Sequence, residues 1–297
     1  MRLNLAMKRR EFLGTSVSAA VWAAGWRTPR FSAAHIRFGY AAITWGGNDC
    51  QAIDDIAALG FRGIQLRQSA VTTWGDRPAE LTHLLAEHHL TLVALSSGEV
   101  PLDPAIEQAT IAYHARNARF VRDVGGRYLQ VIDQRPRGRN PTPDDYRRMG
   151  HLLTEIGRRS ADVGILLGYH NHMGALGQSP EEVARVLDAA DPRLVRLELD
   201  TAHYQQAGGD PAEAVRQHAD RLLFLHIKDL DMSDRFVELG RGRVNFTAVF
   251  AALDAIGFDG WGVVELDSVP DGARTPKESG AIARRYLEAA GRWNDAS

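Results

Sequence analysis

The chain has a single cysteine in 297 residues, Cys50. One thiol cannot form an internal disulfide, so the stability of the folded chain has to come from its core. The sequence also lacks an excess of charge of either sign, since its formal net charge is −2. Its longest basic cluster is the short stretch Arg135–Arg139, which gives no electrostatic reason to bind a polyanion. We therefore expect no nucleic-acid partner.

No hydrophobic run is long enough to span a membrane. The mildly apolar stretch Thr15–Trp26 is shorter than the about 20 residues that a transmembrane helix needs. It follows KRREFLG at 8–14 and precedes SAA at 32–34, an order that is typical of a twin-arginine export signal. The alternative is a basic start to an ordinary helix. We expect residues 1–34 to be a signal peptide, residues 35–297 to form one domain, and the mature protein to be periplasmic or otherwise exported, without a stable membrane anchor.

The sequence lacks a Gly-x-Gly-x-x-Gly motif after its first predicted strand, so a dinucleotide-binding open sheet has little support. What it has is a regular alternation of short apolar runs with amphipathic stretches. Eight runs are predicted as strands: 36–42, 63–66, 90–96, 127–132, 164–170, 194–200, 222–226 and 262–266. A helical stretch, often opened by proline or a capping residue, follows each of them. Eight strand–helix units in about 260 residues predict a single (β/α)8 TIM barrel of the α/β class.

In a (β/α)8 barrel, catalytic groups lie where the strands end and the next helices begin. Four consecutive predicted strands finish with metal-ligating side chains, namely His170, Asp200, His226 and Glu265. Each one alone has an ordinary explanation, since a strand-end aspartate can cap a helix and a buried histidine can be a hydrogen-bonded core residue. A mixed set of imidazoles and carboxylates suits a divalent ion such as Mn²⁺, Co²⁺, Fe²⁺, Zn²⁺ or Mg²⁺. Four such residues at equivalent positions therefore predict a metal site.

Four short motifs surround these residues: YHNHMG at 169–174, DTAH at 200–203 leading into AGGDP at 207–211, LHIKD at 225–229, and VVE at 263–265. With them the chain, from about residue 36 to residue 287, resembles the xylose isomerase-like sugar isomerases, epimerases and lyases, most closely the inosose (keto-inositol) dehydratase branch. The resemblance implies a metal held by Asp200, His226 and Glu265. Many members of the family have a carboxylate at the position of His170, so His170 is either the fourth ligand or a contact to the substrate.

The histidine at position 170 bears on the chemistry that the resemblance implies. In the epimerases of the family, carboxylates on the fifth and eighth strands exchange protons on opposite faces of one substrate carbon. Because this chain has His170 in place of the fifth-strand carboxylate, proton transfer on one face of the substrate is favoured over two-base epimerisation. A divalent ion lowers the cost of an enolate by stabilising charge on oxygen, while a base removes the α-proton. Expulsion of a β leaving group then makes the enzyme a lyase. Lys228 or His172 is the candidate base, and His203 is a further candidate for proton transfer.

Other residues at the predicted strand ends fit a polyhydroxylated substrate. Trp45 follows the first strand, and it either stacks on a sugar or plugs the barrel. Ser97 and Glu99 follow the third strand, while Gln130 and Asp133 lie at the end of the fourth. Glu99 has the alternative explanation of a solvated loop residue. We expect these five residues to form the substrate-binding rim of the barrel.

The sequence thus predicts an exported, divalent-metal-dependent lyase or isomerase whose partner is a small keto-sugar, keto-glycoside or keto-cyclitol, with β-elimination favoured. A sugar isomerase or epimerase is one alternative. Another is a non-catalytic carbohydrate-binding barrel, which the missing carboxylate at position 170 supports. A nuclease on the same fold needs more histidine and aspartate ligands and a basic groove, which neither the charge nor the pattern provides.

Overall fold

The computed structural model describes residues 34–272 and 274–293. Residues 1–33, which include Arg9, Arg10 and nearly all of the predicted signal peptide, lie outside the described residues. The export signal and the domain boundary after residue 34 therefore stay predictions. Within the described ranges, no helix combines the length and the apolar character needed to cross a membrane.

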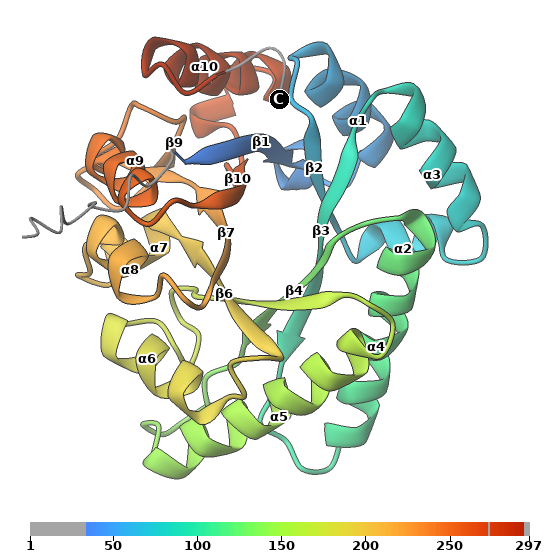
Figure 1. Ribbon diagram of the computed structural model, residues 1–297, viewed down its shortest axis with the longest axis vertical. Coiled ribbons are helices and arrows are strands. Elements are labelled where there is room, and N and C mark those ends of the chain that lie inside the picture. Colours follow the sequence, from blue (N-terminus) through green and yellow to red (C-terminus); the bar gives the residue numbers. More distant parts are fainter. Residues whose placement is uncertain (1–33, 273, 294–297) are drawn as a thin grey trace, which may run out of the picture. The chain divides into compact units, whose positions relative to one another are not determined.

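Eight parallel strands close into a barrel in the order β1-β10-β7-β6-β5-β4-β3-β2, and Figure 1 shows the helices around its outside. The strands are β1 (His35–Ala41), β2 (Gly63–Arg67), β3 (Thr91–Val100), β4 (Tyr128–Asp133), β5 (Leu166–His170), β6 (Val195–Asp200), β7 (Leu222–Ile227) and β10 (Asp259–Val264). Each predicted strand overlaps one of these, so the predicted (β/α)8 barrel is confirmed and closure of the sheet excludes an open one. The last strand ends earlier than predicted, and Glu265 directly follows it.

Helices connect successive strands on the outside of the barrel. They are α1 (Asp49–Ala58), α2 (Ser69–Trp74), α3 (Pro78–Glu87), α4 (Glu107–Val124), α5 (Pro143–Ala161), α6 (Pro180–Ala189), α7 (Thr201–Gln206), α8 (Pro211–Gln217), α9 (Phe246–Ala255) and α10 (Pro276–Ala289), with short 3-10 turns η1 (Ala42–Trp45) and η2 (Pro270–Gly272). Ser179 and Thr275 open α6 and α10 with capping boxes, in which a glutamate three residues later bonds back to the cap. Local sequence therefore fixes where these helices begin.

The apolar core has two parts separated by the strands. The larger part combines outward-facing strand residues with the inner faces of the helices. The smaller part fills the barrel interior and contains Phe224, Trp261 and Val263. Tyr128 of β4 stacks on Phe224 of β7 with ring centroids 5.3 Å apart, and because these strands are not neighbours in the barrel, this contact crosses its interior. Alternate strand residues face inward, so their position in the strand decides which side chains reach the interior.

The connection after β7 contains a two-stranded hairpin, formed by β8 (Asp229–Leu230) and β9 (Phe236–Val237). The buried carboxylate of Asp229 accepts hydrogen bonds from the backbone N–H groups of Leu230, Gly240, Gly242 and Val244. A Cβ atom on residue 242 would lie 2.2 Å from Oδ1 of Asp229, so this close approach requires glycine. The loop therefore has a fixed path, and it brings Phe236 to the mouth of the barrel, 4.9 Å from the ring of His203.

Candidate active site

The four predicted metal ligands come together at the C-terminal end of the barrel. His170 and Asp200 are the last residues of β5 and β6, His226 is the penultimate residue of β7, and Glu265 follows β10. All four are buried. One ligand atom from each of His170, Asp200 and His226 lies within 4.8 Å of the others, while Oε1 of Glu265 lies 3.4 Å from Nδ1 of His226. The predicted ligands thus form a single cluster.

The imidazole of His226 is at the centre of this cluster. Its Nδ1 faces Oδ2 of Asp200 and Oε1 of Glu265, each at 3.4 Å. On the other side of the ring, Nε2 lies 2.6 Å from Oε1 of Glu198 and 3.0 Å from Oε1 of Gln65. Gln65 belongs to β2, so its contact with His226 crosses the barrel interior. Each ring nitrogen therefore has its own set of oxygen neighbours.

The carboxylate of Asp200 uses its two oxygens differently. Oδ1 accepts a hydrogen bond from the backbone N–H of His203 at 2.8 Å and so caps α7. Oδ2 is buried, has no hydrogen-bond partner in the part of the chain that the structure describes, and faces Nδ1 of His226. The alternative explanation of Asp200 as a helix cap is therefore correct for one oxygen, while the other is available to a cation.

Side-chain hydrogen bonds hold the strand ends together around the cluster. The amide of Asn171 donates to the carbonyl oxygen of Asp200 at 3.2 Å and accepts from its backbone N–H at 2.9 Å. Asn171 thereby extends the ladder between β5 and β6 beyond its last backbone pair, His170 with Glu198. The hydroxyl of Thr201 similarly bonds the backbone N–H and carbonyl groups of Lys228. These contacts fix the spacing of the ends of β5, β6 and β7.

The ammonium group of Lys228 lies beside the ligand cluster. Its Nζ is 3.0 Å from Oε1 of Glu265, 2.6 Å from Oδ1 of Asp267 and 3.4 Å from Nε2 of His203. The ring of Phe236 covers it, with its centroid 4.1 Å from Nζ. The side chain is 1% exposed, so a buried cation, neutralised by two carboxylates, adjoins the predicted metal site.

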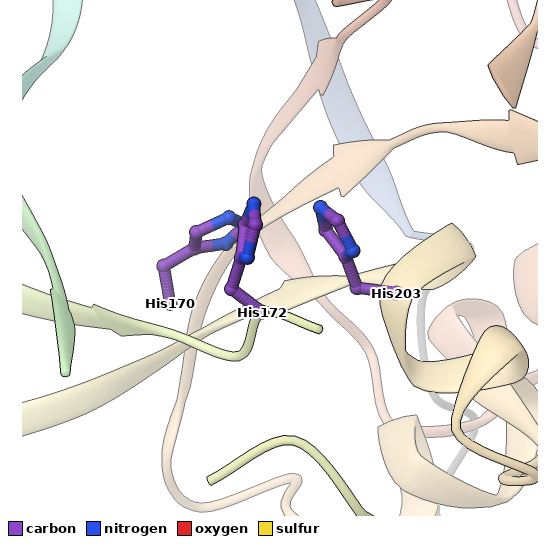
Figure 2. A group of neighbouring side chains, drawn as sticks. All are labelled: His170, His172 and His203. Carbon is purple, nitrogen blue, oxygen red and sulfur yellow. The ribbon is translucent and has the colours of Figure 1, made fainter. Parts of the chain in front are cut away.

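A second group of ligating atoms lies at the same mouth of the barrel. Figure 2 shows the imidazoles of His170, His172 and His203 side by side, and one nitrogen of each lies within 4.8 Å of the other two. The ring centroids of His172 and His203 are 3.9 Å apart. Nδ1 of His172 contacts the carbonyl oxygen of Met173 at 2.7 Å. The structure therefore brings the predicted catalytic histidines His172 and His203 next to the predicted ligand His170.

Burial and neighbouring charges shift the pKa values of the buried histidines in different directions. Burial lowers the pKa of His170 well below its ordinary value and that of His203 to about 3. Burial also acts to lower the pKa of His226, but the charges of Glu198 and Glu265 raise it well above the ordinary value. His170 and His203 therefore present neutral imidazoles, the form in which histidine binds metal ions.

Asp200 and Lys228 are held in their charged forms. Burial acts to raise the pKa of Asp200, but its interactions with His203, Lys228 and His226 keep it well below the ordinary value. Burial likewise acts to lower the pKa of Lys228, but the carboxylates of Glu265, Asp200 and Asp267 raise it above the ordinary value. A protonated Lys228 fits the role of an acid or of a group that stabilises negative charge, and it does not fit the predicted role of base.

Glu198 and Gln65 are site residues that the sequence analysis missed. Glu198 lies two residues before Asp200 in β6, so strand alternation places both carboxylates on the inward face. Glu198 is fully buried, and burial raises its pKa to about 7 against the lowering effect of His226. The signal was present in Leu-Glu-Leu-Asp at 197–200, where a carboxylate interrupts an apolar strand one inward position before a predicted ligand.

Ser97 does not face the barrel mouth as predicted. Its hydroxyl lies 2.7 Å from Nδ1 of His114 and accepts a hydrogen bond from Asn117 at 2.9 Å, both on α4. The register of β3 against β4 shifts between Ser96 and Glu99. Ser97 follows Leu95 of the outer core by two residues, so strand alternation turns it toward the helix layer, where it is fully buried and anchors α4.

Asp133 also differs from its predicted role. Its carboxylate accepts hydrogen bonds from the hydroxyl of Tyr169 at 2.8 Å and from the backbone N–H groups of Leu176 and Gly177. These partners tie the segment after β5 to the end of β4. Asp133 follows Gln130 by three residues, so strand alternation places the two side chains on opposite faces of β4. A substrate inside the barrel could therefore not have contacted both Gln130 and Asp133.

Trp45 and Glu99 differ in burial and therefore in whether a substrate could contact them. Trp45 is buried, donates its indole N–H to Asp55 of α1 at 2.9 Å and packs edge-on against Tyr40. These contacts favour the packing alternative over sugar stacking. Glu99 is exposed and lines a cavity together with His172. Gln130 is buried, and its Oε1 has no hydrogen-bond partner among the described residues. Glu99 and Gln130 therefore have polar groups available to a substrate.

Two cavities lie at the barrel mouth, beside residues that neighbour the ligand cluster. One has a volume of about 410 Å³ and is lined by the ends of β3 and β4 and by the segments after β4 and β5, including Glu99, Asp133 and His172. The other, of about 440 Å³, lies beside the hairpin and is lined by Phe236 and Arg274 among others. A further cavity of about 560 Å³ lies between α2 and α4 and is lined by none of the predicted site residues. Space for a substrate therefore adjoins both His172 and Phe236.

The donor set of the cluster fits a divalent ion. Nδ1 of His170, Nδ1 of His226 and Oδ2 of Asp200 are buried and have no hydrogen-bond partner within residues 34–272 and 274–293. Buried polar atoms are normally paired, so three unpaired atoms on residues whose ligand atoms converge point to a cation. Imidazole nitrogens and carboxylate oxygens together suit Mn²⁺, Fe²⁺, Co²⁺ or Zn²⁺. Glu265 is placed to complete the set.

Known proteins share this sequence pattern. Residues 53–288 match the xylose isomerase-like TIM barrel family. An inosose dehydratase from Lacticaseibacillus casei is 26% identical over 293 residues, an alignment that covers 86% of this chain and 97% of that protein. The similarity therefore extends over nearly the whole length of this relative.

Solved structures share the fold at lower sequence identity. A structure of the IOLI protein with a bound zinc atom has a TM-score of 0.75 at 18% identity, covering 87% of this chain and 99% of its own. A sugar phosphate isomerase/epimerase from Parabacteroides distasonis has a TM-score of 0.69 at 20% identity, covering 85% and 98%. At these identities the comparison shows a common fold.

These comparisons agree with the motifs around the ligand cluster. The names of the relatives support an enzyme of the lyase or isomerase type. The family match spans the strands that carry His170, Asp200, His226 and Glu265. The chain therefore belongs to the xylose isomerase-like TIM barrel family.

Proposed function

We propose that this protein is a divalent-metal-dependent lyase acting on a keto-cyclitol, keto-sugar or keto-glycoside, with isomerisation of the same substrates as the second candidate. One observation carries the proposal: His170, Asp200 and His226 direct ligand atoms to within 4.8 Å of one another, and Lys228 lies alongside, bonded to Glu265. The dehydratase name of the Lacticaseibacillus casei relative favours elimination. The isomerase/epimerase name of a protein with the same fold keeps isomerisation as the second candidate.

His170, Asp200, His226 and Glu265 would hold the ion. When bound, a divalent ion supplies a Lewis acid that polarises a carbonyl or hydroxyl oxygen of the substrate. Two imidazoles in the set favour Mn²⁺, Co²⁺, Fe²⁺ or Zn²⁺ over Mg²⁺, which prefers oxygen ligands. The zinc atom in the IOLI structure supports an ion on this fold.

Three residues supply proton transfer beside the ligands. His172 lines the cavity of about 410 Å³ and is the proposed base for the α-proton of the substrate. Lys228 donates hydrogen bonds to Glu265 and Asp267, so it is the proposed acid for the leaving group. His203 lies between them, with its ring 3.9 Å from that of His172 and its Nε2 3.4 Å from Nζ of Lys228. Removal of the α-proton and departure of a protonated β-oxygen group complete an elimination.

We also propose that the protein is exported by the twin-arginine route, which favours a substrate met outside the cytoplasm. The motif KRREFLG at 8–14, followed by a short apolar run, supports this proposal. Replacing Arg9 and Arg10 together by lysine should leave the precursor in the cytoplasm, as measured by cell fractionation. Undiminished export of the double-lysine variant would contradict the proposal and leave the enzymatic function untouched.

The reaction is tested by incubating Mn²⁺- or Co²⁺-loaded protein with 2-keto-inositol and with 3-keto-glucosides in D₂O, followed by mass spectrometry. A lyase releases water from the cyclitol or an aglycone from the glycoside. An isomerase leaves the mass unchanged except for solvent deuterium. Protein of verified metal content that produces neither change would overturn the enzymatic proposal in favour of a carbohydrate-binding barrel. The variant His151→Ala, altered at an exposed position of α5, is a control for the preparation.

A further inference from the structure

Glu198 occupies an unusual position inside the barrel. Its side chain is fully buried in β6, and its Oε1 lies 2.6 Å from Nε2 of His226. In the described part of the chain, no lysine or arginine forms an ion pair with it. Its partner is instead the imidazole of His226. A buried carboxylate is expensive to keep, so its presence at this position calls for a function.

The geometry around His226 indicates what that function is. Nδ1 of His226 faces the ligand cluster, 3.4 Å from Oδ2 of Asp200 and from Oε1 of Glu265. A histidine that binds an ion through Nδ1 has to carry its proton on Nε2. Glu198 lies on the Nε2 side of the ring, one inward position before Asp200 on the same strand. A carboxylate that accepts the N–H of a ligating imidazole fixes its tautomer and orientation and makes it a stronger ligand.

We propose that Glu198 is a positioning residue that holds His226 with its proton on Nε2 and its Nδ1 directed at the metal site. This inference rests on the proposed metal-dependent function. Glu198 does not contact the substrate or the ion, and it acts through His226. The amide oxygen of Gln65, on the opposite wall of the barrel, makes a hydrogen bond to the same Nε2 at 3.0 Å. Glu198 is the acidic one of the two neighbours, and its contact with Nε2 is the shorter.

The test measures metal binding by Glu198→Gln, which keeps the shape and an acceptor oxygen but removes the charge. We expect its dissociation constant for Mn²⁺ and Zn²⁺ to rise about 10- to 100-fold, as measured by isothermal titration calorimetry. Gln65→Leu should have a smaller effect because Glu198 is still present. Tyr128→Phe changes the barrel interior at the ring stacked on Phe224, away from His226, and is the matched control with unchanged affinity.

A spectroscopic measurement separates positioning from general packing. The visible absorption bands of Co²⁺ report the geometry of its ligands, so Glu198→Gln should shift these bands while Tyr128→Phe leaves them unchanged. The metal-free variant should unfold at or above the temperature of the metal-free wild type, whereas the increase in stability on adding metal should shrink. A loss of metal-free stability with unchanged affinity and unchanged bands would assign Glu198 to packing alone and overturn the proposal.

The outcomes also distinguish this inference from the function on which it rests. Wild-type affinity in Glu198→Gln, with weakened binding in Gln65→Leu, would transfer the positioning role to Gln65 and overturn the assignment to Glu198. A wild-type protein that binds no divalent ion would overturn the metal site itself. If Glu198→Gln weakens metal binding but no substrate reacts, the positioning role stands and the proposed reaction fails.

Discussion

The two halves of the barrel use polar residues at strand ends in different ways. In the half formed by β5, β6, β7 and β10, these residues face the interior, and His170, Asp200 and His226 converge to ligand distance. In the half formed by β1 to β4, Ser97 bonds to α4 and Asp133 bonds to Tyr169 and to the segment after β5. The first half therefore supplies the ligand cluster, while Ser97 and Asp133 of the other half anchor neighbouring elements.

The two halves differ because the direction of a side chain matters as much as its residue type. A strand turns successive side chains to opposite faces, so a polar residue reaches the barrel interior at every second position. Asp200 and Glu198 share the inward face of β6, whereas Asp133 and Gln130 of β4 cannot share one. A carboxylate at a strand end is therefore a candidate ligand only when it occupies one of the alternate positions that face the barrel interior.

The largest effects are expected in the half that carries the ligands. Asp200→Ala and His226→Ala should each weaken Mn²⁺ or Zn²⁺ binding by more than the about 10- to 100-fold that loss of a supporting residue costs, and abolish turnover with it. Metal content after dialysis, measured by atomic emission, checks this. Asp133→Asn, from the other half, should keep its metal. Stoichiometric metal in both alanine variants would break the comparison.

His170→Ala sharpens the same comparison within the ligand half. A ligand role predicts loss of metal affinity, whereas a substrate-contact role predicts retained metal with lower turnover. His172→Ala should keep metal and lose deuterium exchange at the substrate carbon, because His172 is the proposed base. If His172→Ala loses metal while Asp200→Ala keeps it, the ion is held by the three-imidazole group of His170, His172 and His203.

Lys228→Met should have the next largest effect. Loss of the acid is expected to lower kcat by about 10²- to 10⁴-fold, while metal stays bound because Lys228 is not a ligand. Steady-state kinetics on metal-verified protein measure this. Lys277→Met, which removes a half-exposed ammonium paired with Asp55, is the control and should keep the wild-type rate. A Lys228→Met enzyme of normal kcat would remove this residue from the mechanism.

Asp133→Asn tests the other half through stability. Burial raises the pKa of Asp133 to about 6, although its hydrogen bonds to Tyr169 and Gly177 lower it. The folded state then binds this proton more tightly than the unfolded state, so the stability that the proton contributes is fully present below about pH 4 and is lost as the pH rises through about 6. We expect the variant to be about 1–3 kcal/mol less stable at pH 4.

Asparagine does not titrate, so the deficit of Asp133→Asn should shrink or reverse at pH 7. Urea unfolding at the two pH values measures it. The KM of the variant should equal that of the wild type, since its partners are protein groups. A raised KM with unchanged stability would instead return Asp133 to the substrate-binding rim, as the sequence predicted.

Trp45→Phe should have the smallest effect. It removes the hydrogen bond from the indole N–H to Asp55 but keeps an aromatic ring against Tyr40, so we expect a loss of about 1 kcal/mol in the free energy of unfolding. Thermal unfolding and KM are the two measurements. An unchanged melting temperature combined with a higher KM would show that Trp45 stacks on the substrate.

The sequence predicted the barrel because all eight apolar runs and their capped helices follow one repeating pattern. It also placed His170, Asp200, His226 and Glu265 at strand ends, where closure of the barrel brings them together. Ser97 could not be assigned in this way, because the register of β3 shifts against both neighbouring strands, which the sequence does not show. The spacing along each strand could have corrected the other two residues. Asp133 is three residues from Gln130 and therefore faces the opposite side, while Glu198 is two residues from Asp200 and therefore faces the same side.

The amide of Asn171 has a wider consequence. Because it pairs with both backbone groups of Asp200, the ligand-bearing ends of β5 and β6 belong to the rigid sheet and not to the loops beyond it. The loop segments around Arg137 and Phe236 can therefore change in length or sequence without displacing the ligands. Laboratory evolution of these loop segments should therefore change which substrates bind, while the positions of the ligands stay the same.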